Sequence, residues 1–411
     1  MGSMDVDEQA VASRIPAELG DGEPGEPRAA PGREAGRRFE ALRAAWPGWV
    51  AGHLLVILVS WHLHPKHPLA ALSEWDTVWY RTIAQQGYGD GSLVHFFPLT
   101  SGTAWLVREA TRIPAGIALF SVVWLAGLLF GAALYRLTLF ETGDRGAARR
   151  AAWLIQLAPG AYALVMGYTE PLAGLLGVLY FLCLRSVSVE GRGPGLALLR
   201  RHGLWLAALL GLLAGVSRPT GILLVAVGLV EGLRIARAAG WRPLVLAETA
   251  LAAAAPVLGL VGFLAYSKIE YGSWTKPLSQ QMIKQNRGAV LNDPLSSIHF
   301  WLHGAARANH GLQTVTMCLL LIFGTALLIV FVARKLPLSY LLWTLPSFAF
   351  AITSHAFTSL PRYVGALFPV VMVLAVMTGT AKRWQRYAVY AFSVALLVWT
   401  SHTVLATWLV A

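Results

Sequence analysis

Long apolar stretches recur along most of the chain and constrain its fold more than any other feature. A helix that crosses a bilayer needs roughly 20 largely apolar residues. About eleven stretches approach that scale, at residues 46–63, 113–136, 151–167, 171–187, 203–217, 219–234, 243–267, 312–333, 337–353, 362–380 and 387–409. The pattern predicts an all-α polytopic membrane protein with about eleven transmembrane helices. The short pairs that meet at Glu170 and at Ser217-Arg218-Pro219 are also compatible with half-length hairpins.

The composition agrees with a membrane protein. Only 13% of the residues are charged and 56% are hydrophobic, whereas soluble domains carry about 25% charged residues. The net charge of +12 comes from basic clusters between apolar stretches, which is typical of topology signals, so we expect no nucleic-acid partner. Cys183 and Cys318 both fall inside apolar stretches, where we expect small buried side chains rather than a disulfide or a zinc site.

The N-terminal residues differ from the rest. Residues 1 to about 44 are rich in Gly, Pro, Ala, Glu and Arg, without apolar periodicity, so residues 1–44 are expected to form a disordered cytoplasmic tail. They contain no apolar core of the kind that signal peptides carry. Residues 45–411 are expected to form one transmembrane domain in the cell membrane.

The basic residues predict the sidedness of the chain. If the tail is cytoplasmic and the spans alternate, 22 of the 33 Lys and Arg residues fall on the cytoplasmic side, as the positive-inside rule requires. The first loop, 64–112, the second loop, 268–311, and the C-terminus are then extracytoplasmic. Residues 96–107 are too short to span at about 1.5 Å per residue, and a crossing there would invert the later basic clusters, so we expect them to lie along the surface.

The first extracytoplasmic loop carries the densest polar and aromatic run of the chain. Apolar residues within 73–88 recur at helical spacing and Gly87 stands at a C-cap position, which predicts an interfacial amphipathic helix. Ser73 and Asp76 match a capping box. Asp76 therefore has two compatible interpretations, a helix cap and a catalytic carboxylate, and Glu74 is positioned to share the second role.

Further polar groups are expected on the same side. Glu170 lies in the run Tyr168-Thr169-Glu170-Pro171, Arg218 lies between two apolar spans, and Arg362 ends a short turn that begins at His355. A charge at the centre of a membrane helix costs about 2.5–3.5 kcal/mol on insertion scales. Either arginine alone is equally compatible with snorkelling to a headgroup phosphate, but the four groups on one side indicate a site.

Glycosyl transfer from a polyprenyl-phosphate sugar suits such a site. A carboxylate can take the proton of an acceptor hydroxyl, and arginines can stabilise the departing phosphate. The catalytic candidates are Asp76 and Glu74, and the candidates for donor-phosphate binding are Arg362, Arg218 and Arg81. The candidates for substrate binding are Trp75, Trp79, Tyr80, His95, Tyr168, Glu170, Lys276, Gln281 and Tyr363. No metal ligands are indicated, although a divalent metal remains compatible.

The same residues carry a resemblance to a known family. The run Trp75-Asp76-x-x-Trp79-Tyr80-x-x-Ile83-Ala84-x-x-Gly87-Tyr88, followed by Phe96-Phe97-Pro98-Leu99, resembles the signature of PIG-V-type (GPI mannosyltransferase II) proteins and their bacterial relatives. Tyr168-Thr169-Glu170, Ser217-Arg218-Pro219-Thr220-Gly221 and Leu360-Pro361-Arg362-Tyr363 follow in the family's order, so the resemblance covers roughly residues 46–380.

The resemblance implies a GT-C membrane glycosyltransferase that uses a dolichyl- or polyprenyl-phosphate mannose donor at an extracytoplasmic active site. It also implies that Asp76 is the general base and that Arg362 and Arg218 contact phosphate. Thr100-Ser101 after the Phe-Phe-Pro-Leu run and Pro171 after Glu170 depart from many relatives, which leaves the acceptor open among a glycolipid, a glycan and a protein. A lipid-linked sugar flippase or transporter, and a non-catalytic scaffold for another glycosyltransferase, are the alternatives.

Overall fold

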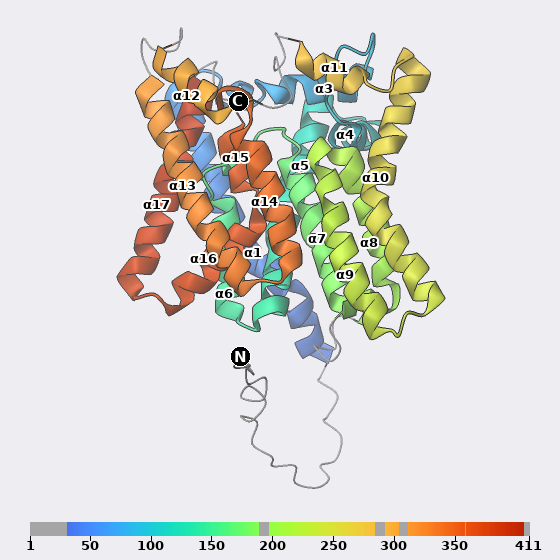
Figure 1. Ribbon diagram of the computed structural model, residues 1–411. Helices are drawn as coiled ribbons and strands as arrows, with labels where there is room; N and C mark the ends of the chain where they lie inside the picture. Colours follow the sequence, from blue (N-terminus) through green and yellow to red (C-terminus); the bar gives the residue numbers. More distant parts are fainter. Residues whose placement is uncertain (1–30, 189–196, 284–291, 304–310, 358, 407–411) are drawn as a thin grey trace, which may run out of the picture. The chain divides into compact units, whose positions relative to one another are not determined.

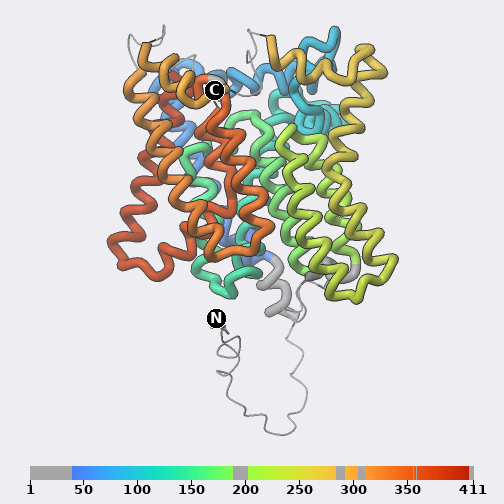
Figure 2. The backbone as a smooth tube through the Cα atoms, viewed as in Figure 1, coloured from blue at the N-terminus to red at the C-terminus, as the bar shows by residue number. Residues whose placement is uncertain are grey.

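The computed structural model describes residues 31–188, 197–283, 292–303, 311–357 and 359–406. The chain divides into two units after Phe39, and the description below concerns the second, which begins at Glu40. The described residues form helices joined by turns and contain no strand (Figures 1 and 2). The α-helices are α1 Pro31–Leu63, α2 Pro68–Ala71, α3 Asp76–Gln86, α4 Pro98–Thr111, α5 Ala115–Thr142, α6 Arg145–Gln156, α7 Glu170–Ser188, α8 Ala197–Ser217, α9 Leu224–Ala238, α10 Pro243–Tyr271, α11 Lys276–Met282, α12 Pro294–His303, α13 Gly311–Lys335, α14 Leu338–Ile352, α15 Leu360–Gly365, α16 Phe368–Thr380 and α17 Arg383–Ala406. The 3₁₀ turns used below are η1 Ala161–Leu164, η3 Pro219–Leu223 and η5 His355–Phe357.

The chain is a multi-pass membrane protein. Seven of its helical segments are long and apolar enough to cross a bilayer, and they lie in α1, α5, α7, η3–α9, α10, α13 and α17. Shorter apolar helices occur at His202–Ser217, Leu338–Ile352 and Phe368–Thr380. The all-α polytopic prediction is confirmed. Residues 1–30 of the expected tail lie outside the described residues, and residues 31–44 are helical, as the first part of α1.

Two of the expected spans are not continuous helices. The stretch predicted at 151–167 is helical only to Gln156, because Pro159 has no backbone N–H and Pro159-Gly160 interrupts the helical pattern. The chain then passes through η1 and an irregular segment to Glu170. The stretch predicted at 362–380 is divided in the same way between α15 and α16, with Pro369 in the first turn of the second helix.

The irregular segment 157–169 is nevertheless almost entirely buried. Within a membrane, non-helical backbone is tolerated where it is enclosed by protein and its polar groups find partners. Trp124 of α5 donates its indole N–H to the carbonyl oxygen of Val165 at 2.8 Å. Ser393 of α17 donates its hydroxyl to the carbonyl oxygen of Leu157 at 2.8 Å. Hydrogen bonds from α5 and α17 therefore fix the irregular segment, which ends where Glu170 begins α7.

Polar elements lie at both ends of the membrane-spanning helices, and each end has its own set of elements. α3, α4, α11 and α12 lie at the upper end in Figure 1, whereas α6 and the α9–α10 connection lie at the lower end. Four of the basic residues that were predicted to be cytoplasmic, Arg145, Arg149, Arg237 and Arg242, fall in or next to these lower elements. The 14-residue α4 is not among the membrane-spanning candidates.

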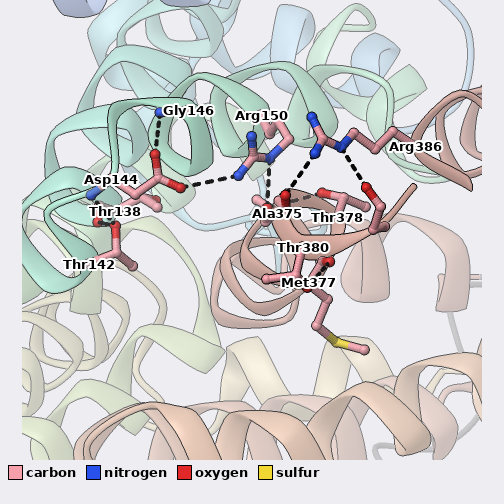
Figure 3. A network of polar contacts seen from close by, with 12 residues as sticks. Thr138, Thr142, Asp144, Gly146, Arg150, Ala375, Met377, Thr378, Thr380 and Arg386 are labelled. Carbon is pink, nitrogen blue, oxygen red and sulfur yellow. Dashed lines mark hydrogen bonds and ion pairs between the residues drawn. The ribbon is translucent and has the colours of Figure 1, made fainter. Parts of the chain in front are cut away.

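Two arginines stabilise the lower end of α16 (Figure 3). Arg150 donates its Nε–H to the carbonyl oxygen of Ala375 at 2.8 Å, and Arg386 donates from Nη2 to that of Gly379 at 2.8 Å. The Gly379 carbonyl is one of the last four of α16, which have no partner within the helix, and cations near this end also complement the helix dipole. Basic residues at this end thus stabilise the end of α16.

A buried ion-pair network joins α5, α7, α9 and α14. Arg185 holds Glu141 with two hydrogen bonds of 2.8 and 3.2 Å and reaches Glu231 at 3.2 Å. Tyr340 donates its hydroxyl to Glu141 at 2.9 Å, and Ser339 donates to Glu231. A buried charge is costly unless it is paired and hydrogen-bonded, and both acids meet this condition. We interpret this network as structural.

Candidate active site

Four charged side chains that are far apart in the sequence lie together in the structure. Arg362 Nη1 contacts Asp76 Oδ2 at 2.6 Å, and Arg362 Nε lies 3.6 Å from Glu170 Oε1. Arg218 Nη1 reaches the same Glu170 oxygen at 3.3 Å. Glu170 and Arg362 are almost fully buried, with 1% and 4% of their side-chain surface exposed, while Asp76 keeps 25%. Asp76 is therefore the member that a ligand can reach most easily.

Helix ends explain how these charges are tolerated in a mostly apolar protein. Asp76 is the first residue of α3 and Glu170 is the first residue of α7. Arg218 directly follows α8, and Arg362 lies in the last turn of α15. Helix dipoles favour negative charge at the N-terminus and positive charge at the C-terminus. Asp76, Glu170 and Arg362 thus match the helix end on which they lie. Arg218 matches the C-terminal end of α8 and is at the same time the N-cap residue of η3.

The backbone before Asp76 differs from the predicted capping box, and that prediction is wrong. Helix α3 begins at Asp76, its N-cap residue is Trp75, and no side chain caps it. The Ser73 hydroxyl instead donates to the carbonyl oxygen of Leu69 at 3.3 Å. Trp75 has φ 61°, which is unfavourable for a bulky residue, and its indole N–H donates to the carbonyl oxygen of Val404 at 3.1 Å. Gly87 does end α3, with φ 73°, as predicted.

Arg362 is held by its neighbours on several sides. Its Nη2 donates to Ser359 Oγ at 2.9 Å. Its guanidinium carbon lies 4.9 Å from the centre of the Tyr168 ring and 5.3 Å from that of Tyr363. Arg218 lies over the same Tyr363 ring at 4.8 Å. These cation–π contacts favour charged guanidiniums and fix their planes.

Two glycines allow the broken segments to meet at this point. A Cβ atom on Gly160 would lie 2.1 Å from the carbonyl oxygen of Pro361 and 2.7 Å from Arg362 Cα. A Cβ atom on Gly365 would lie 2.7 Å from Gly160 Cα. Segment 157–169 and α15 therefore approach each other more closely than side chains allow, and this approach positions Arg362.

The site also holds buried polar atoms without hydrogen-bond partners. Among the described residues, eleven such side-chain atoms occur, and five of them belong to Tyr168, Thr169, Glu170 and Arg362. Buried polar groups are normally satisfied, so a concentration of exceptions calls for an explanation. The Tyr168 hydroxyl is one of these atoms, and a phenol can donate a hydrogen bond. These atoms are suited to bind a polar ligand or water.

A small cavity of about 60 Å³ adjoins the buried side of the cluster. Glu170, Arg218, Ser347 and Tyr363 line it together with small residues of α7 and α8. The volume is enough to hold water, since one molecule needs at least about 10–15 Å³ on this measure.

Several predicted site residues lie away from the four charges. Glu74 is exposed and lines a separate cavity with Lys66. Trp79 is 45% exposed. Arg81 extends along α5, where its Cδ would lie 3.5 Å from a Cβ atom on Gly116. No ion pair between Arg81 and the cluster occurs in the described part of the chain.

The remaining predicted residues support the surface elements. Tyr80 is buried and meets the Phe96 ring edge-on at 5.2 Å. The His95 ring packs on Phe96 at 4.4 Å. Lys276 donates to the carbonyl oxygen of Asp90 at 3.0 Å and so joins α11 to the loop after α3. Gln281 is buried in α11.

Three contributors were not predicted. Ser359 binds Arg362, and Gly160 permits the close approach of α15. Thr77 accepts the backbone N–H of Gly167 at 3.1 Å and so fixes the start of α3 to the buried irregular segment. Ser359 lies three residues before Arg362, and this spacing could have predicted their contact. A single sequence does not show that Gly160 is needed because another backbone passes close to it.

No group of three His, Cys, Asp or Glu side chains within the described ranges is arranged to hold a metal ion. Comparison with known proteins finds no matching family model and no matching curated protein.

Solved structures are similar at low sequence identity. ArnT from Cupriavidus metallidurans bound to undecaprenyl phosphate has a TM-score of 0.49 and 15% identity, with 87% of this chain and 76% of that chain covered. The archaeal oligosaccharyltransferase AglB from Archaeoglobus fulgidus, in complex with an inhibitory peptide and a dolichol-phosphate, has a TM-score of 0.44 and 13% identity, again over 87% of this chain. This chain spans about half of that oligosaccharyltransferase, 55% of its length. Both similarities are remote.

Proposed function

We propose that the protein is a GT-C-type glycosyltransferase that transfers a mannosyl or other hexosyl residue from a polyprenyl-phosphate donor to an extracytoplasmic acceptor. The observation that carries the proposal is the cluster of two carboxylates and two arginines, in which Asp76 is the accessible member. The PIG-V-type motifs supply the mannosyl specificity and the class of donor. The basic elements at the opposite end of the helices support an extracytoplasmic site and a cytoplasmic N-terminus.

Each charged residue has a role that follows from its position. Asp76 accepts the proton of the acceptor hydroxyl as that oxygen attacks the anomeric carbon. The bond from the anomeric carbon to the phosphate oxygen breaks, and the polyprenyl phosphate leaves with the added negative charge. Arg362 and Arg218 stabilise that charge, since a guanidinium stays ionised and donates several hydrogen bonds in one plane.

Glu170 has a positioning role in this proposal. It is 1% exposed and lies between both arginines, at 3.3 Å from Arg218 and 3.6 Å from Arg362. A buried carboxylate there balances the two positive charges before the donor arrives. It also holds both guanidiniums towards one point, which lowers the cost of ordering them when phosphate binds.

The test is transfer of labelled mannose from polyprenyl-phosphate mannose to membrane lipids by purified, reconstituted protein. Asp76→Asn should reduce the rate by about 10²- to 10⁴-fold, the range typical of a general base. Asp90→Asn is the matched control, because Asp90 lies in the same loop but is exposed and bonded within its own turn. Asp76→Asn protein that folds normally and transfers at the wild-type rate would refute the role of base. Movement of the lipid-linked sugar across the bilayer without a covalent product would instead identify a flippase.

A further inference from the structure

Helix α11 buries a polar side chain and exposes apolar ones. Gln281 is buried, with 9% of its surface exposed, and Pro277, one turn earlier, is buried as well. Leu278 and Met282, on the exposed side of the same helix, are 47% and 60% exposed. A helix at the surface of a soluble protein shows the reverse arrangement, with its apolar side chains against the core. The exposed side of α11 therefore needs an apolar environment outside the protein.

The apolar exposure extends beyond both ends of α11. Trp274, which precedes the helix, is 48% exposed, and Ile283, which follows it, is 39% exposed. With Leu278 and Met282, four large apolar side chains are exposed within residues 274–283. Single exposed apolar residues are normal on a protein, whereas a contiguous group marks a surface that contacts something else. We call these four residues the α11 patch.

The preceding helix fixes the level of the α11 patch in the bilayer. Helix α10 has 29 residues, and at about 1.5 Å per residue it is roughly 43 Å long. A bilayer with its headgroups is about 40–45 Å thick. Tyr266 and Lys268, near the end of α10, are exposed, and tyrosines and snorkelling lysines gather at the headgroup level. Since α11 begins only five residues after α10 ends, the patch lies at that level.

The surface of α10 that leads to the patch faces lipid. Helix α10 is one of the segments able to span the membrane, and its exposed apolar residues run along its whole length. They include Leu244, Leu258, Val261 and Ile269, which are 44–79% exposed. Ile269, the most exposed of these, lies in the last turn of α10, directly before the patch. Lipid thus already covers the neighbouring surface, and it is the apolar environment that continues to α11.

We propose that α11 is an interfacial anchor, which lies among the lipid headgroups with the α11 patch inserted towards the acyl chains. Tryptophan suits this position because its ring is amphipathic. Interfacial helices bury their apolar side about 5–10 Å into the boundary between headgroups and acyl chains. The leaflet is the one at the end of the protein that carries α3 and α4, where Figure 1 places α11. This anchor does not depend on glycosyl transfer.

The anchor also holds the loop that follows α3. Lys276 Nζ donates to the carbonyl oxygen of Asp90 at 3.0 Å and lies 4.5 Å from the centre of the Tyr271 ring. A Cβ atom on Gly91 would lie 2.7 Å from the Tyr271 ring and 2.8 Å from Lys276 Nζ. Residues 89–94 are therefore packed tightly against the junction of α10 and α11. The depth of α11 in the headgroup region thus fixes the height of this loop above the bilayer.

Site-directed spin labelling tests the position of the patch. Both native cysteines, Cys183 and Cys318, are buried, so a thiol-reactive nitroxide modifies an introduced surface cysteine selectively. Leu278→Cys is labelled and reconstituted in vesicles of phosphatidylcholine and phosphatidylglycerol, and Ser92→Cys, exposed in the loop after α3, is the control. Electron paramagnetic resonance then compares collision with oxygen, which concentrates in lipid, and with a water-soluble nickel chelate. We expect the ratio of oxygen to nickel accessibility to be at least threefold higher at position 278 than at position 92, and Met282→Cys to behave like Leu278→Cys.

Two results would overturn the anchor. Equal ratios at positions 278, 282 and 92 would place the patch in water. Protection of positions 278 and 282 from both reagents would show that protein, such as a second copy of this chain, covers the patch instead of lipid.

Hydrogen exchange gives a measurement without a label. In the same vesicles, the double variant Trp274→Gln, Leu278→Gln should exchange the amide hydrogens of residues 89–94 and 274–283 at least tenfold faster than the wild type. Ser279→Gln, an exposed polar position of the same helix, is the control and should exchange as the wild type does. Wild-type exchange in the double variant would refute the anchoring of the loop.

Discussion

Replacement of Gly160 by alanine tests whether the contact between the two broken segments positions the site. The new Cβ atom would lie 2.1 Å from the Pro361 carbonyl oxygen, and real Cβ contacts essentially never fall below 3.0 Å. The neighbour is backbone and cannot rotate away, so α15 and the segment that carries Gly160 must separate by at least about 0.9 Å, the difference between these distances. Arg362 moves with α15, and its 2.6 Å contact with Asp76 lengthens or breaks.

Two measurements follow from this displacement. A misplacement of about 1 Å in a catalytic site can reduce the rate about 10²-fold, so mannosyl transfer by Gly160→Ala should fall by that order. Overpacking typically costs about 1–3 kcal/mol, so the thermal unfolding midpoint in detergent should fall as well. Gly262→Ala is the control, because a Cβ atom on Gly262 meets nothing within 4 Å.

A second glycine, Gly365, allows the same contact to be tested independently. Gly365→Ala pushes on the same contact from the other side, where its Cβ atom would lie 2.7 Å from Gly160 Cα. It should therefore reproduce the loss of activity. Wild-type transfer and an unchanged unfolding midpoint in Gly160→Ala would show that the approach of the two segments does not position Arg362.

Three other predictions concern the ion pairs and the strained turn. Arg362→Lys keeps the charge but loses the planar fork that reaches Asp76, so we expect transfer at least tenfold below wild type in the labelled-mannose assay. Glu141→Gln leaves Arg185 poorly paired in the buried network, so unfolding monitored by tryptophan fluorescence should show a loss of about 3–5 kcal/mol, while activity per folded molecule is unchanged. Trp75→Phe removes the hydrogen bond to Val404 and should cost about 1 kcal/mol in the same unfolding assay; an unaltered midpoint would contradict the anchoring role.

Much of this architecture could be predicted because it depends on local patterns. Apolar stretches of sufficient length predicted the helices, and Gly87 and Pro219 marked two boundaries that the structure shows. The breaks at 157–169 and 366–367 were missed because a prediction from hydropathy alone passes over Pro159-Gly160 and Pro369, whose neighbours are as apolar as the helices around them. Hydropathy measures burial in such a chain and does not distinguish a helix from an enclosed irregular segment.

The site was only partly predictable, for a related reason. Asp76, Glu170, Arg218 and Arg362 stood out because ionisable residues are rare in a membrane protein and each lay at an expected helix end. Glu74 was placed with Asp76 because the two are close in the sequence. The positive φ of Trp75 turns the chain between them, so that they lie in different surroundings. Such a turn at a bulky residue leaves no signal in a single sequence.

The matched charges at the four helix ends have a consequence for turnover. Two carboxylates and two guanidiniums sum to zero, so a bound donor phosphodiester brings the site to one net negative charge. During transfer, Asp76 would gain a proton and lose its charge as the departing phosphate monoester gains one. The total charge of the site stays constant, because one negative charge is lost at the Asp76 carboxylate and one is gained at the phosphate. In the proposed mechanism both groups contact the guanidinium of Arg362. The resting ion pairs would thus let transfer proceed with no change in the net charge of the site, in a region of the protein where added charge would be costly.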